Sequence, residues 1–456
     1  MKTEAEAEAA TLWVSCTGAR SGEGPVTWGQ YAIWHALRAL RPGDHAYNVP
    51  VDGPVSPPLP LETVRQALGG LLYVHDALRT RVVEAPDGEL RQQLDGEGGA
   101  PLHLRPGTAD TAAGIGAELR QELWGRAFDY AGEWQARFGV VVEDGLVHHL
   151  AAVFSHTAAD AWGLPRLMED LIALSTGASR EQVREDSAAE LQPLEQAAEQ
   201  RSARGQRLDA AARRHWRSAA AGARAPETRP RPAPAPEDPP YRRAHLLSPA
   251  LPQALARLCP AVRATPPTVL LAATALTLAE WAGTGRCGLQ LMVNNRFHSG
   301  LARATGPLAM EGYLAIDTEG ADFAELLGRT KRASLAAYRS AYYDKSALEA
   351  ELAPYAGEPG VLFERSCWYN DQRVAPLPAP DPAWTAAASP AATLSWQPAT
   401  DHGGRVSYVL HMADQPGGLE IAMTADSRLF TPAETERLLR AIERTVIDKA
   451  TAAPLS

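Results

Sequence analysis

The sequence predicts a mixed α/β (α+β) protein that folds as two lobes. Its 456 residues exceed what one ordinary hydrophobic core organises, so more than one lobe is expected. Segments with helical periodicity alternate with strand-like apolar runs in both halves of the chain, which hints at a duplicated fold. Between the halves, residues 224–240 are rich in proline. Because proline disfavours helices and central strands, we expect an extended connector there.

The first half shows helical periodicity in four places and strand-like runs in three. The first helix is ended by Arg41-Pro42-Gly43-Asp44, a turn sequence. Asp144-Gly145, a dipeptide typical of tight hairpins, joins two of the strands. The expected elements are helices at 28–40, 61–80, 112–127 and 164–175, and strands at 81–83, 135–143 and 146–154.

A region rich in alanine, arginine and glutamate, residues 180–221, is expected to be helical, and the second half then repeats the alternation. The elements expected there are helices at 249–262, 267–281, 322–343 and 432–450, and strands at 288–293, 405–411 and 419–425. The chain is therefore divided into a frayed acidic tail (1–10), an N-terminal lobe (11–221), the proline-rich connector (222–241) and a C-terminal lobe (242–456).

Composition narrows the classes of function. Hydrophobic residues make up 45% of the chain and charged residues 21%, as in soluble globular proteins. The net charge of -10 and the lack of a basic stripe argue against nucleic acid as a partner. The chain start lacks a signal-peptide core, and the most apolar window, 269–279, is about half a membrane span, so we expect a cytoplasmic protein without membrane contact. The four cysteines, Cys16, Cys259, Cys287 and Cys367, form no Cys-x-x-Cys pair, which indicates neither a zinc site nor a disulfide framework.

The end of the strand expected at 146–154 holds the candidate chemistry. The strand leads into Ser155 and His156, and Asp160 follows four residues after the histidine. A neutral imidazole presented at a strand end is a competent general base, and the aspartate can fold back to brace the turn. The alternative is a buried, hydrogen-bonded histidine with a structural role, which is also the role we expect for the two histidines within the strand.

Several segments resemble, in order, the motifs of the condensation domains of nonribosomal peptide synthetases. The resemblance extends over about residues 26–445. The segments that carry it are Val26-Thr27-Trp28-Gly29-Gln30 with Trp34, Pro42 and Tyr47-Asn48-Val49-Pro50; His75-Asp76-Ala77-Leu78-Arg79-Thr80; Phe128-Asp129; Ser155-His156-Thr157-Ala158-Ala159-Asp160-Ala161-Trp162; Asn295-Arg296 with Gly306; Trp368-Tyr369-Asn370; and Thr424-Ala425-Asp426-Ser427-Arg428-Leu429-Phe430.

The resemblance implies two chloramphenicol-acetyltransferase-like lobes arranged as a V-shaped pseudo-dimer, with an active-site tunnel between them. It implies that His156 is catalytic, as the second histidine of the family's His-His-x-x-x-Asp-Gly motif, and that no metal takes part. Asp160, Arg296 and Arg79 would support the site. The residues nominated to line the tunnel, for which ordinary core or loop positions are the alternative, are Ser155, Ala161, Trp162, Asn370, Ser395 and Trp396.

The chain also departs from the family pattern. Ser155 stands where the motif has its first histidine, and Ala161 stands where it has glycine. Val74 replaces the arginine that usually leads the second motif, and residues 306–310 differ from the family's Gly-x-Phe-Val-Asn segment. Since His156 is retained, the chemistry stays possible in a divergent member.

The function implied is that of a free-standing condensation enzyme in a natural-product pathway, such as antibiotic biosynthesis. An acyl or aminoacyl thioester on the phosphopantetheine arm of a partner carrier protein would be joined to an acceptor amine, on a small molecule or on a second carrier, with no tightly bound cofactor. Two alternatives stay open. One is a non-catalytic recruitment module, which the residues Ser155 and Ala161 favour. The other is a coenzyme A-dependent or ester-forming acyltransferase of the same superfamily.

Overall fold

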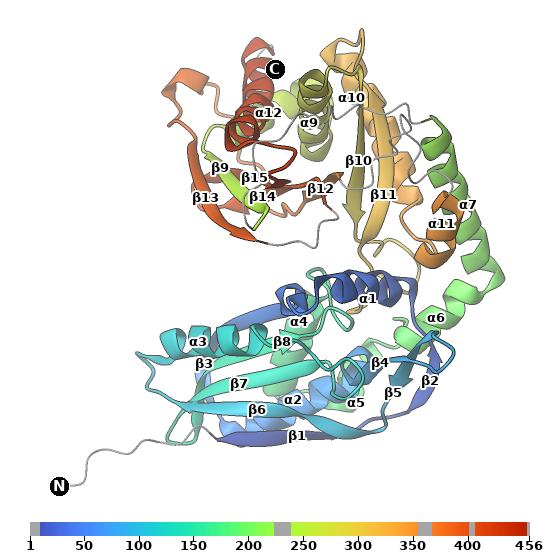
Figure 1. The fold of residues 1–456 in the computed structure, drawn as a ribbon. Helices are drawn as coiled ribbons and strands as arrows, with labels where there is room; N and C mark the ends of the chain where they lie inside the picture. The colour runs from blue at the N-terminus through green and yellow to red at the C-terminus, as the bar shows by residue number, and fades with distance from the viewer. Residues whose placement is uncertain (1–9, 223–238, 354–366, 401–405, 454–456) are drawn as a thin grey trace. The chain divides into compact units, whose positions relative to one another are not determined.

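The computed structural model describes residues 10–222, 239–353, 367–400 and 406–453. Most of the predicted tail and most of the predicted connector lie outside the described residues. The chain forms two compact units (Figure 1). Unit 1 comprises residues 1–207 and 294–310, and unit 2 comprises residues 208–293 and 311–456. Each unit packs helices on a sheet, so the predicted mixed α/β, two-lobed fold is confirmed.

Unit 1 contains a five-stranded sheet with the order β1-β6-β7-β8-β3 and a three-stranded sheet with the order β2-β5-β4. Its elements are β1 (Thr11–Thr17), β2 (Gly22–Pro25), α1 (Trp28–Leu40), the 3-10 helix η1 (Asp44–Tyr47), β3 (Val49–Pro60), α2 (Leu61–Val74), the 3-10 helix η2 (Asp76–Arg79), β4 (Thr80–Glu84), β5 (Leu90–Leu94), β6 (Glu97–Pro106), α3 (Ala112–Trp124), β7 (Ala136–Glu143), β8 (Leu146–Phe154), α4 (Leu164–Ser175), α5 (Arg180–Asp186) and α6 (Pro193–Arg201).

Helices cover both faces of the five-stranded sheet. Leu68 of α2 and Leu171 of α4 share one buried cluster with alternate residues of the strands, such as Phe138. Leu37 of α1 and Leu119 of α3 share a second cluster, on the opposite face. Figure 1 shows α3 and α2 on opposite sides of this sheet. Strands β7 and β8 are therefore buried on both faces, and any side chain presented at the end of β8 emerges from a rigid core.

Unit 2 contains a seven-stranded sheet with the order β11-β10-β12-β14-β15-β9-β13. Helices α8, α9, α10 and α12 contribute to one continuous hydrophobic cluster on one face of this sheet. Unit 2 begins within α7 (Ala203–Gly222), after residue 207. The other elements of unit 2 are β9 (Tyr241–Ser248), α8 (Leu251–Val262), α9 (Pro266–Ala282), β10 (Arg286–Val293), β11 (Met310–Asp317), α10 (Phe323–Arg339), α11 (Lys345–Leu352), β12 (Cys367–Asp371), the 3-10 helix η4 (Ala386–Ala388), β13 (Thr393–Thr400), β14 (Tyr408–Gln415), β15 (Gly418–Asp426) and α12 (Pro432–Ala452).

Two of the expected helices are shorter than the sequence predicts. The helix expected at 61–80 ends at Val74 and is followed by η2 and β4. The helical region expected at 180–221 is divided into α5, α6 and α7. Helix α6 begins with Pro193 in its first turn, where proline is tolerated, and the Ser202 hydroxyl accepts a hydrogen bond from Gly205 N at the start of α7. These local signals for a helix start therefore divide a region whose composition favours one long helix.

The two units also differ from the contiguous lobes predicted at 11–221 and 242–456. The C-terminal part of α7 belongs to unit 2, where the Trp216 ring contacts the rings of Tyr313 and Tyr343. Residues 294–310 belong to unit 1 although they lie in the second half of the chain. The reason is a set of buried polar contacts between this segment and the end of β8, described below.

Within the residues that the structure describes, no single helix is both long and apolar enough to cross a membrane. Helices α8 and α9 would meet those criteria only as a pair, and they are bent by 99° at their junction. All four cysteines are buried and free.

We expect Gly29→Ala to destabilise the protein by about 1–3 kcal/mol, because a Cβ at Gly29 of α1 would lie 1.7 Å from the backbone oxygen of Pro307. The control is Gly114→Ala in α3, where a Cβ meets no atom within 4 Å. That change should be neutral or stabilising by up to about 1 kcal/mol. Urea denaturation of both variants measures the difference, and equal stability would contradict the close packing of α1 on residues 294–310.

Candidate active site

Strand β8 delivers His156 to the edge of the core of unit 1. Phe154, the last residue of β8, is paired with Val49 of β3 and Ala136 of β7. The chain then leaves the sheet in a tight turn, in which the Ser155 carbonyl accepts hydrogen bonds from the backbone N–H of Ala158 at 3.0 Å and of Ala159 at 3.1 Å. The turn thus presents His156 at a defined point after a buried strand.

The imidazole of His156 is half-buried, and its ring centroid lies 5.8 Å from that of Tyr47 at the end of η1. Its Nδ1 atom is buried and makes no hydrogen bond to another residue in the described part of the chain. Burial lowers the pKa of His156 below its ordinary value, although the negative charge of Asp160 acts to raise it. A neutral imidazole, which can accept a proton, is therefore the favoured form at neutral pH.

Asp160 is buried and lies at the centre of a network of five donors. Its carboxylate accepts from Nη2 of Arg296 at 2.7 Å and from Nη1 at 3.1 Å. It also accepts from the backbone N–H of Gly163 at 2.8 Å, of Leu308 at 3.0 Å and of Ala309 at 3.3 Å. Because both oxygens accept charge-assisted or backbone hydrogen bonds, this carboxylate is suited to hold the turn and the loop together.

Arg296 connects the loop of residues 294–310 to Asp160. Besides Asp160, its guanidinium donates to the Ala304 carbonyl at 2.8 Å. The residue before it, Asn295, has a positive φ of 55°, and its side chain donates to the Leu308 carbonyl at 2.9 Å. The loop of residues 294–310 is therefore folded around the same carboxylate that closes the turn after β8. Asp160 and Arg296, named together from the sequence, are a directly bonded pair.

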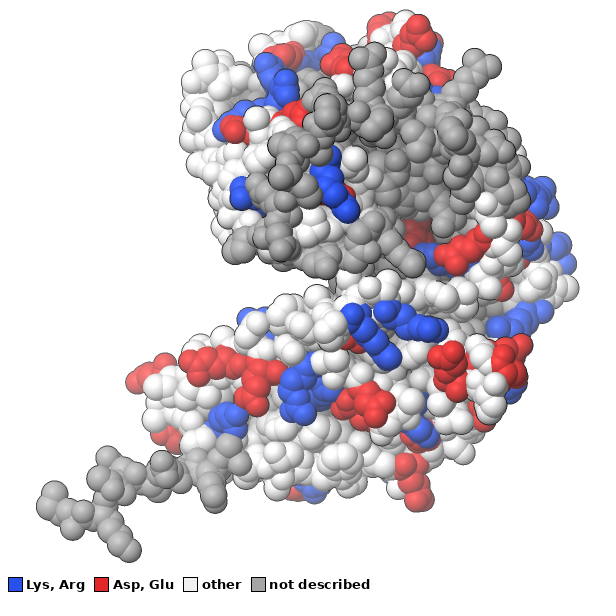
Figure 2. Space-filling model, in the orientation of Figure 1, with Lys and Arg blue, Asp and Glu red and all other residues white. Residues whose placement is uncertain are grey.

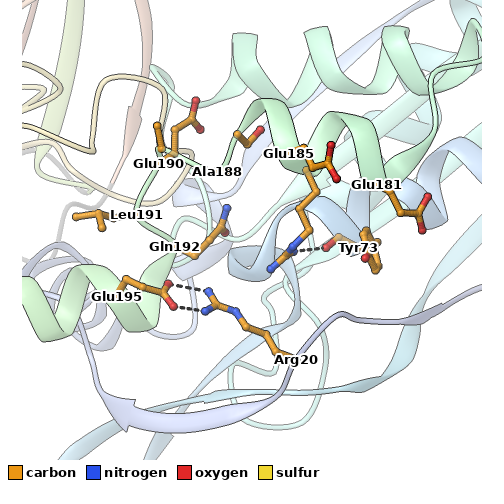
Figure 3. A pocket seen from close by; sticks show the side chains of 12 residues that line it. Arg20, Tyr73, Glu181, Glu185, Ala188, Glu190, Leu191, Gln192 and Glu195 are labelled. Atoms are coloured by element: carbon orange, nitrogen blue, oxygen red, sulfur yellow. Dashed lines mark hydrogen bonds and ion pairs between the residues drawn. The ribbon is translucent and has the colours of Figure 1, made fainter.

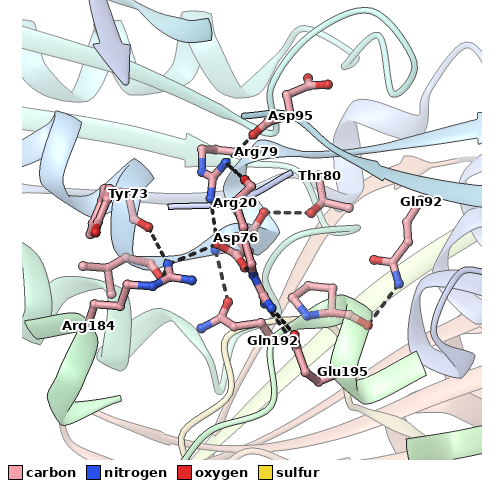
Figure 4. A network of polar contacts seen from close by, with 12 residues as sticks. Arg20, Tyr73, Asp76, Arg79, Thr80, Gln92, Asp95, Arg184, Gln192 and Glu195 are labelled. Carbon is pink, nitrogen blue, oxygen red and sulfur yellow. Dashed lines mark hydrogen bonds and ion pairs between the residues drawn. The ribbon is translucent and has the colours of Figure 1, made fainter. Parts of the chain in front are cut away.

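Arg79 lies in a different network (Figure 4). Its side chain is fully buried and donates to Oδ1 of Asp76 at 2.7 Å and to the Leu72 carbonyl at 2.8 Å. Asp76 also binds Arg20 at 2.6 Å and Arg184 at 3.2 Å. The contacts described for Arg79 include neither His156 nor Asp160. Its position indicates that it stabilises η2 rather than the turn itself.

The residues nominated to line a tunnel occupy varied environments. Ser155 is fully buried and hydrogen-bonded to Thr157, so its side chain is enclosed in unit 1. Ala161 is exposed and Trp162 is half-buried. In unit 2, Trp396 is partly buried and packs against the hydrophobic cluster.

Ser395 and Asn370 of unit 2 share a row with residues that the sequence analysis missed. The register pairs Asn370 with His411, His411 with Ala422, Ala422 with His245, and His245 with Ser395. Directly paired residues point to the same face of a sheet, so two histidines lie in this row. Nδ1 of His245 lies 3.1 Å from Oε2 of Glu420. The period-two alternation of side chains in the strand expected at 405–411 could have assigned His411 to one face of the sheet.

A surface pocket of about 540 Å³ in unit 1 is lined by other residues (Figure 3). Its polar lining includes Arg20, Arg184, Glu190 and Glu195, and it contains none of the nominated site residues. Arg20 forms a bidentate pair with Glu195, and Arg184 donates to the Tyr73 carbonyl at 2.8 Å. Since these cations are already bonded, the pocket has the character of a structural ion-pair cluster.

Surface charge shows no single-sign field on the face drawn in Figure 2, where acidic and basic side chains alternate over unit 1. Among the described residues, no group of three or more His, Cys, Asp or Glu side chains is placed to hold a metal ion.

Comparison with known proteins agrees with this architecture. The Condensation domain family matches residues 21–456. Phosphinothricin tripeptide synthetase PhsC of Streptomyces viridochromogenes is 35% identical over 161 residues, which are 34% of this chain and 14% of that protein. The chain thus corresponds to a small part of that relative.

Two solved structures share the fold. One, described as the molecular basis for condensation domain-mediated chain release from the enacyloxin polyketide synthase, has a TM-score of 0.69 at 20% identity and covers 96% of this chain and 85% of that chain. The other, a complex of the X-domain and OxyB from teicoplanin biosynthesis, has a TM-score of 0.66 at 21% identity and covers 95% of this chain and 94% of that chain.

The fold places the chain in the class of two-unit, mixed α/β proteins that these solved structures share. Within that class, the chain belongs to the condensation-domain family. The resemblance predicted from its motifs is confirmed.

We expect Asp160→Asn to lower the free energy of unfolding by about 3–5 kcal/mol, because it leaves the Arg296 guanidinium buried without a counter-charge. The control is Glu169→Gln, which removes an exposed ion pair with Arg303 and should cost less than about 1 kcal/mol. Urea denaturation checks both values. If the two variants were equally stable, Asp160 would not organise the site.

Proposed function

We propose that this chain catalyses condensation: it transfers an acyl or aminoacyl group from the phosphopantetheine thioester of a carrier protein to an acceptor amine, in nonribosomal peptide or related biosynthesis. The observation that carries the proposal is the half-buried His156 at the end of β8, with a pKa lowered by burial, on a turn held by Asp160 and Arg296. Membership of the condensation-domain family supports the same reaction class.

In this reaction the amine nitrogen attacks the thioester carbonyl carbon, so that a C–N bond forms and the C–S bond breaks. The attacking nitrogen must lose one proton, and the leaving thiolate must gain one. A neutral imidazole at His156 can accept the proton from the nitrogen and return it to the sulfur, which balances the reaction without a further reactant. Holding the two substrates beside this base supplies the rest of the acceleration.

The other residues of the site have supporting roles in this proposal. The Asp160 carboxylate is saturated by the donors described above, so it does not compete with His156 as the base. It holds the turn, while Arg296 compensates its charge. The proposal therefore assigns the proton transfer to one residue and the positioning of that residue to its neighbours.

A second function is a recruitment module that binds a partner without turnover. Two observations favour it: Ser155 and Ala161 replace a histidine and a glycine of the family motif, and an X-domain of similar fold was solved in complex with OxyB. Carrier binding without product formation would support recruitment.

We expect His156→Ala to reduce product formation by at least about 100-fold in a reconstituted reaction with loaded carrier protein, because it removes the base. The matched control is His148→Ala, a histidine within β8 that lies 3.6 Å from Glu143, which should leave the rate within about twofold. Mass spectrometry of the product measures both rates. Unchanged turnover in His156→Ala would overturn the proposed function.

A pH dependence follows from the lowered pKa of His156. The neutral imidazole is the active form, so kcat/KM should stay constant as pH falls to about 6.5 and decline only below that value. The folded state also binds this proton less readily than the unfolded state, so the contribution to stability is present above about pH 6.5 and is lost as pH falls further.

Unfolding free energies at about pH 7.5 and about pH 5.5 test the linkage. The wild type should lose more stability between these values than His156→Gln, which cannot titrate. An equal loss would show that His156 is not desolvated.

A further inference from the structure

Three buried polar side chains surround the backbone of His156. Two belong to the residues next to it in the chain, and the third comes from the segment before β7. Ser155 precedes the histidine, Thr157 follows it, and Gln135 stands directly before β7. Ser155 and Gln135 are fully buried, and Thr157 is 2% exposed. Buried hydroxyl and amide groups are costly unless they are hydrogen-bonded, so their partners must be accounted for.

The three side chains bond to one another in a single order. The hydroxyl of Thr157 donates to Oε1 of Gln135 at 3.0 Å. Because a hydroxyl has one proton, Thr157 must be the acceptor in its 2.8 Å contact with the hydroxyl of Ser155. The chain therefore runs from the Ser155 hydroxyl to the Thr157 hydroxyl and then to the Gln135 amide oxygen.

Backbone contacts anchor this chain at both ends. The Ser155 hydroxyl also accepts from the Thr157 backbone N–H at 3.2 Å, which closes the turn around His156. The Ser155 N–H donates to the Gln135 carbonyl at 3.1 Å, and the Gln135 N–H donates to the Leu78 carbonyl at 2.9 Å. The Gln135 side-chain amide donates to the Glu133 carbonyl at 2.7 Å. Gln135 therefore ties the turn to the core of unit 1.

We propose that the Ser155–Thr157–Gln135 hydrogen-bond chain positions the imidazole of His156, with Thr157 as the central positioning residue. This inference rests on the proposed function of His156. The hydrogen-bond chain holds the backbone on both sides of the histidine, so the position of the ring then depends on the side-chain torsions of His156. It also explains the chemistry of Ser155: at this site a small hydroxyl both donates to Thr157 and accepts from its backbone.

The hydrogen-bond chain positions the histidine and is not a path for proton transfer from it. It ends at Gln135, whose amide oxygen only accepts, and its described hydrogen bonds do not include the imidazole of His156. The three side chains also lie out of solvent, where no substrate reaches them. Thr157 and its neighbours are therefore positioning residues, and a change there should alter how well His156 acts rather than whether substrate binds.

The test uses Thr157→Val, which keeps the size of the side chain and removes the hydroxyl, in the full chain with loaded carrier protein. We expect kcat to fall by about 10–100-fold, as for a base displaced by a fraction of an ångström to 1 Å, while KM for the carrier stays within about twofold. Thr157→Ser, which restores the hydroxyl, should recover most of kcat. Wild-type kcat in Thr157→Val, or no recovery in Thr157→Ser, would overturn the inference.

Thr274→Val is the matched control for burial and size. Thr274 lies in α9 of unit 2, is fully buried, and its hydroxyl has no hydrogen-bond partner among the described residues. The substitution should therefore leave kcat within about twofold of the wild type. A loss of kcat in this control equal to that in Thr157→Val would show a general effect of packing, and would count against positioning.

NMR titration of the His156 imidazole in the folded chain gives a readout that needs no turnover. Thr157→Val should change the titration midpoint of His156, because the ring moves in its buried setting, and Thr157→Ser should restore it. Ser155→Ala serves in place of Thr157→Val if that variant does not fold. An unchanged midpoint in the folded variant would overturn the positioning role. Full turnover in His156→Ala would instead overturn the proposed function, and the titration would still decide whether Thr157 positions the ring.

Discussion

A single buried carboxylate, that of Asp160, holds together the pieces of chain from which the candidate site is made. It accepts from its own turn at Gly163, from Arg296, and from two backbone N–H groups of the loop 294–310. The same loop packs against α1 at Gly29. A charge without these donors could not be buried at this point, so the turn, the loop and the helix depend on one another.

The charge balance around Asp160 also explains the behaviour of His156. A carboxylate four residues away would ordinarily favour a protonated imidazole. Here burial of the ring is the largest effect and lowers the pKa of His156 despite that charge, and the carboxylate itself is paired with Arg296. Burial thus favours the neutral imidazole of His156 although an acidic residue follows four positions later.

How much of the fold and of the candidate site could be predicted from the sequence depended on how far apart the interacting residues lie along the chain. Helices α1 and α4 match the expected bounds because each carries its own signals, such as the Thr27 and Gln30 capping box. Strand β3 was missed because its sequence, Val49–Pro60, contains five prolines; an edge strand tolerates them, since one side of it needs no donors. The pairing of Asp160 with Arg296 was suggested by resemblance alone. By contrast, the link from Thr157 to Gln135 leaves no pattern in the sequence, because 22 residues separate two ordinary polar side chains.

The membership of residues 294–310 in unit 1 has a consequence for how this chain can be taken apart. Unit 1 is completed by a loop encoded almost 90 residues after the rest of it ends, as 294 − 207 = 87. A fragment that stops at the connector would therefore retain the His156 turn and lose both Arg296 and the backbone donors of Leu308 and Ala309. The N-terminal half is thus not a self-sufficient structural unit, and a fragment designed to keep unit 1 intact must include residues 294–310.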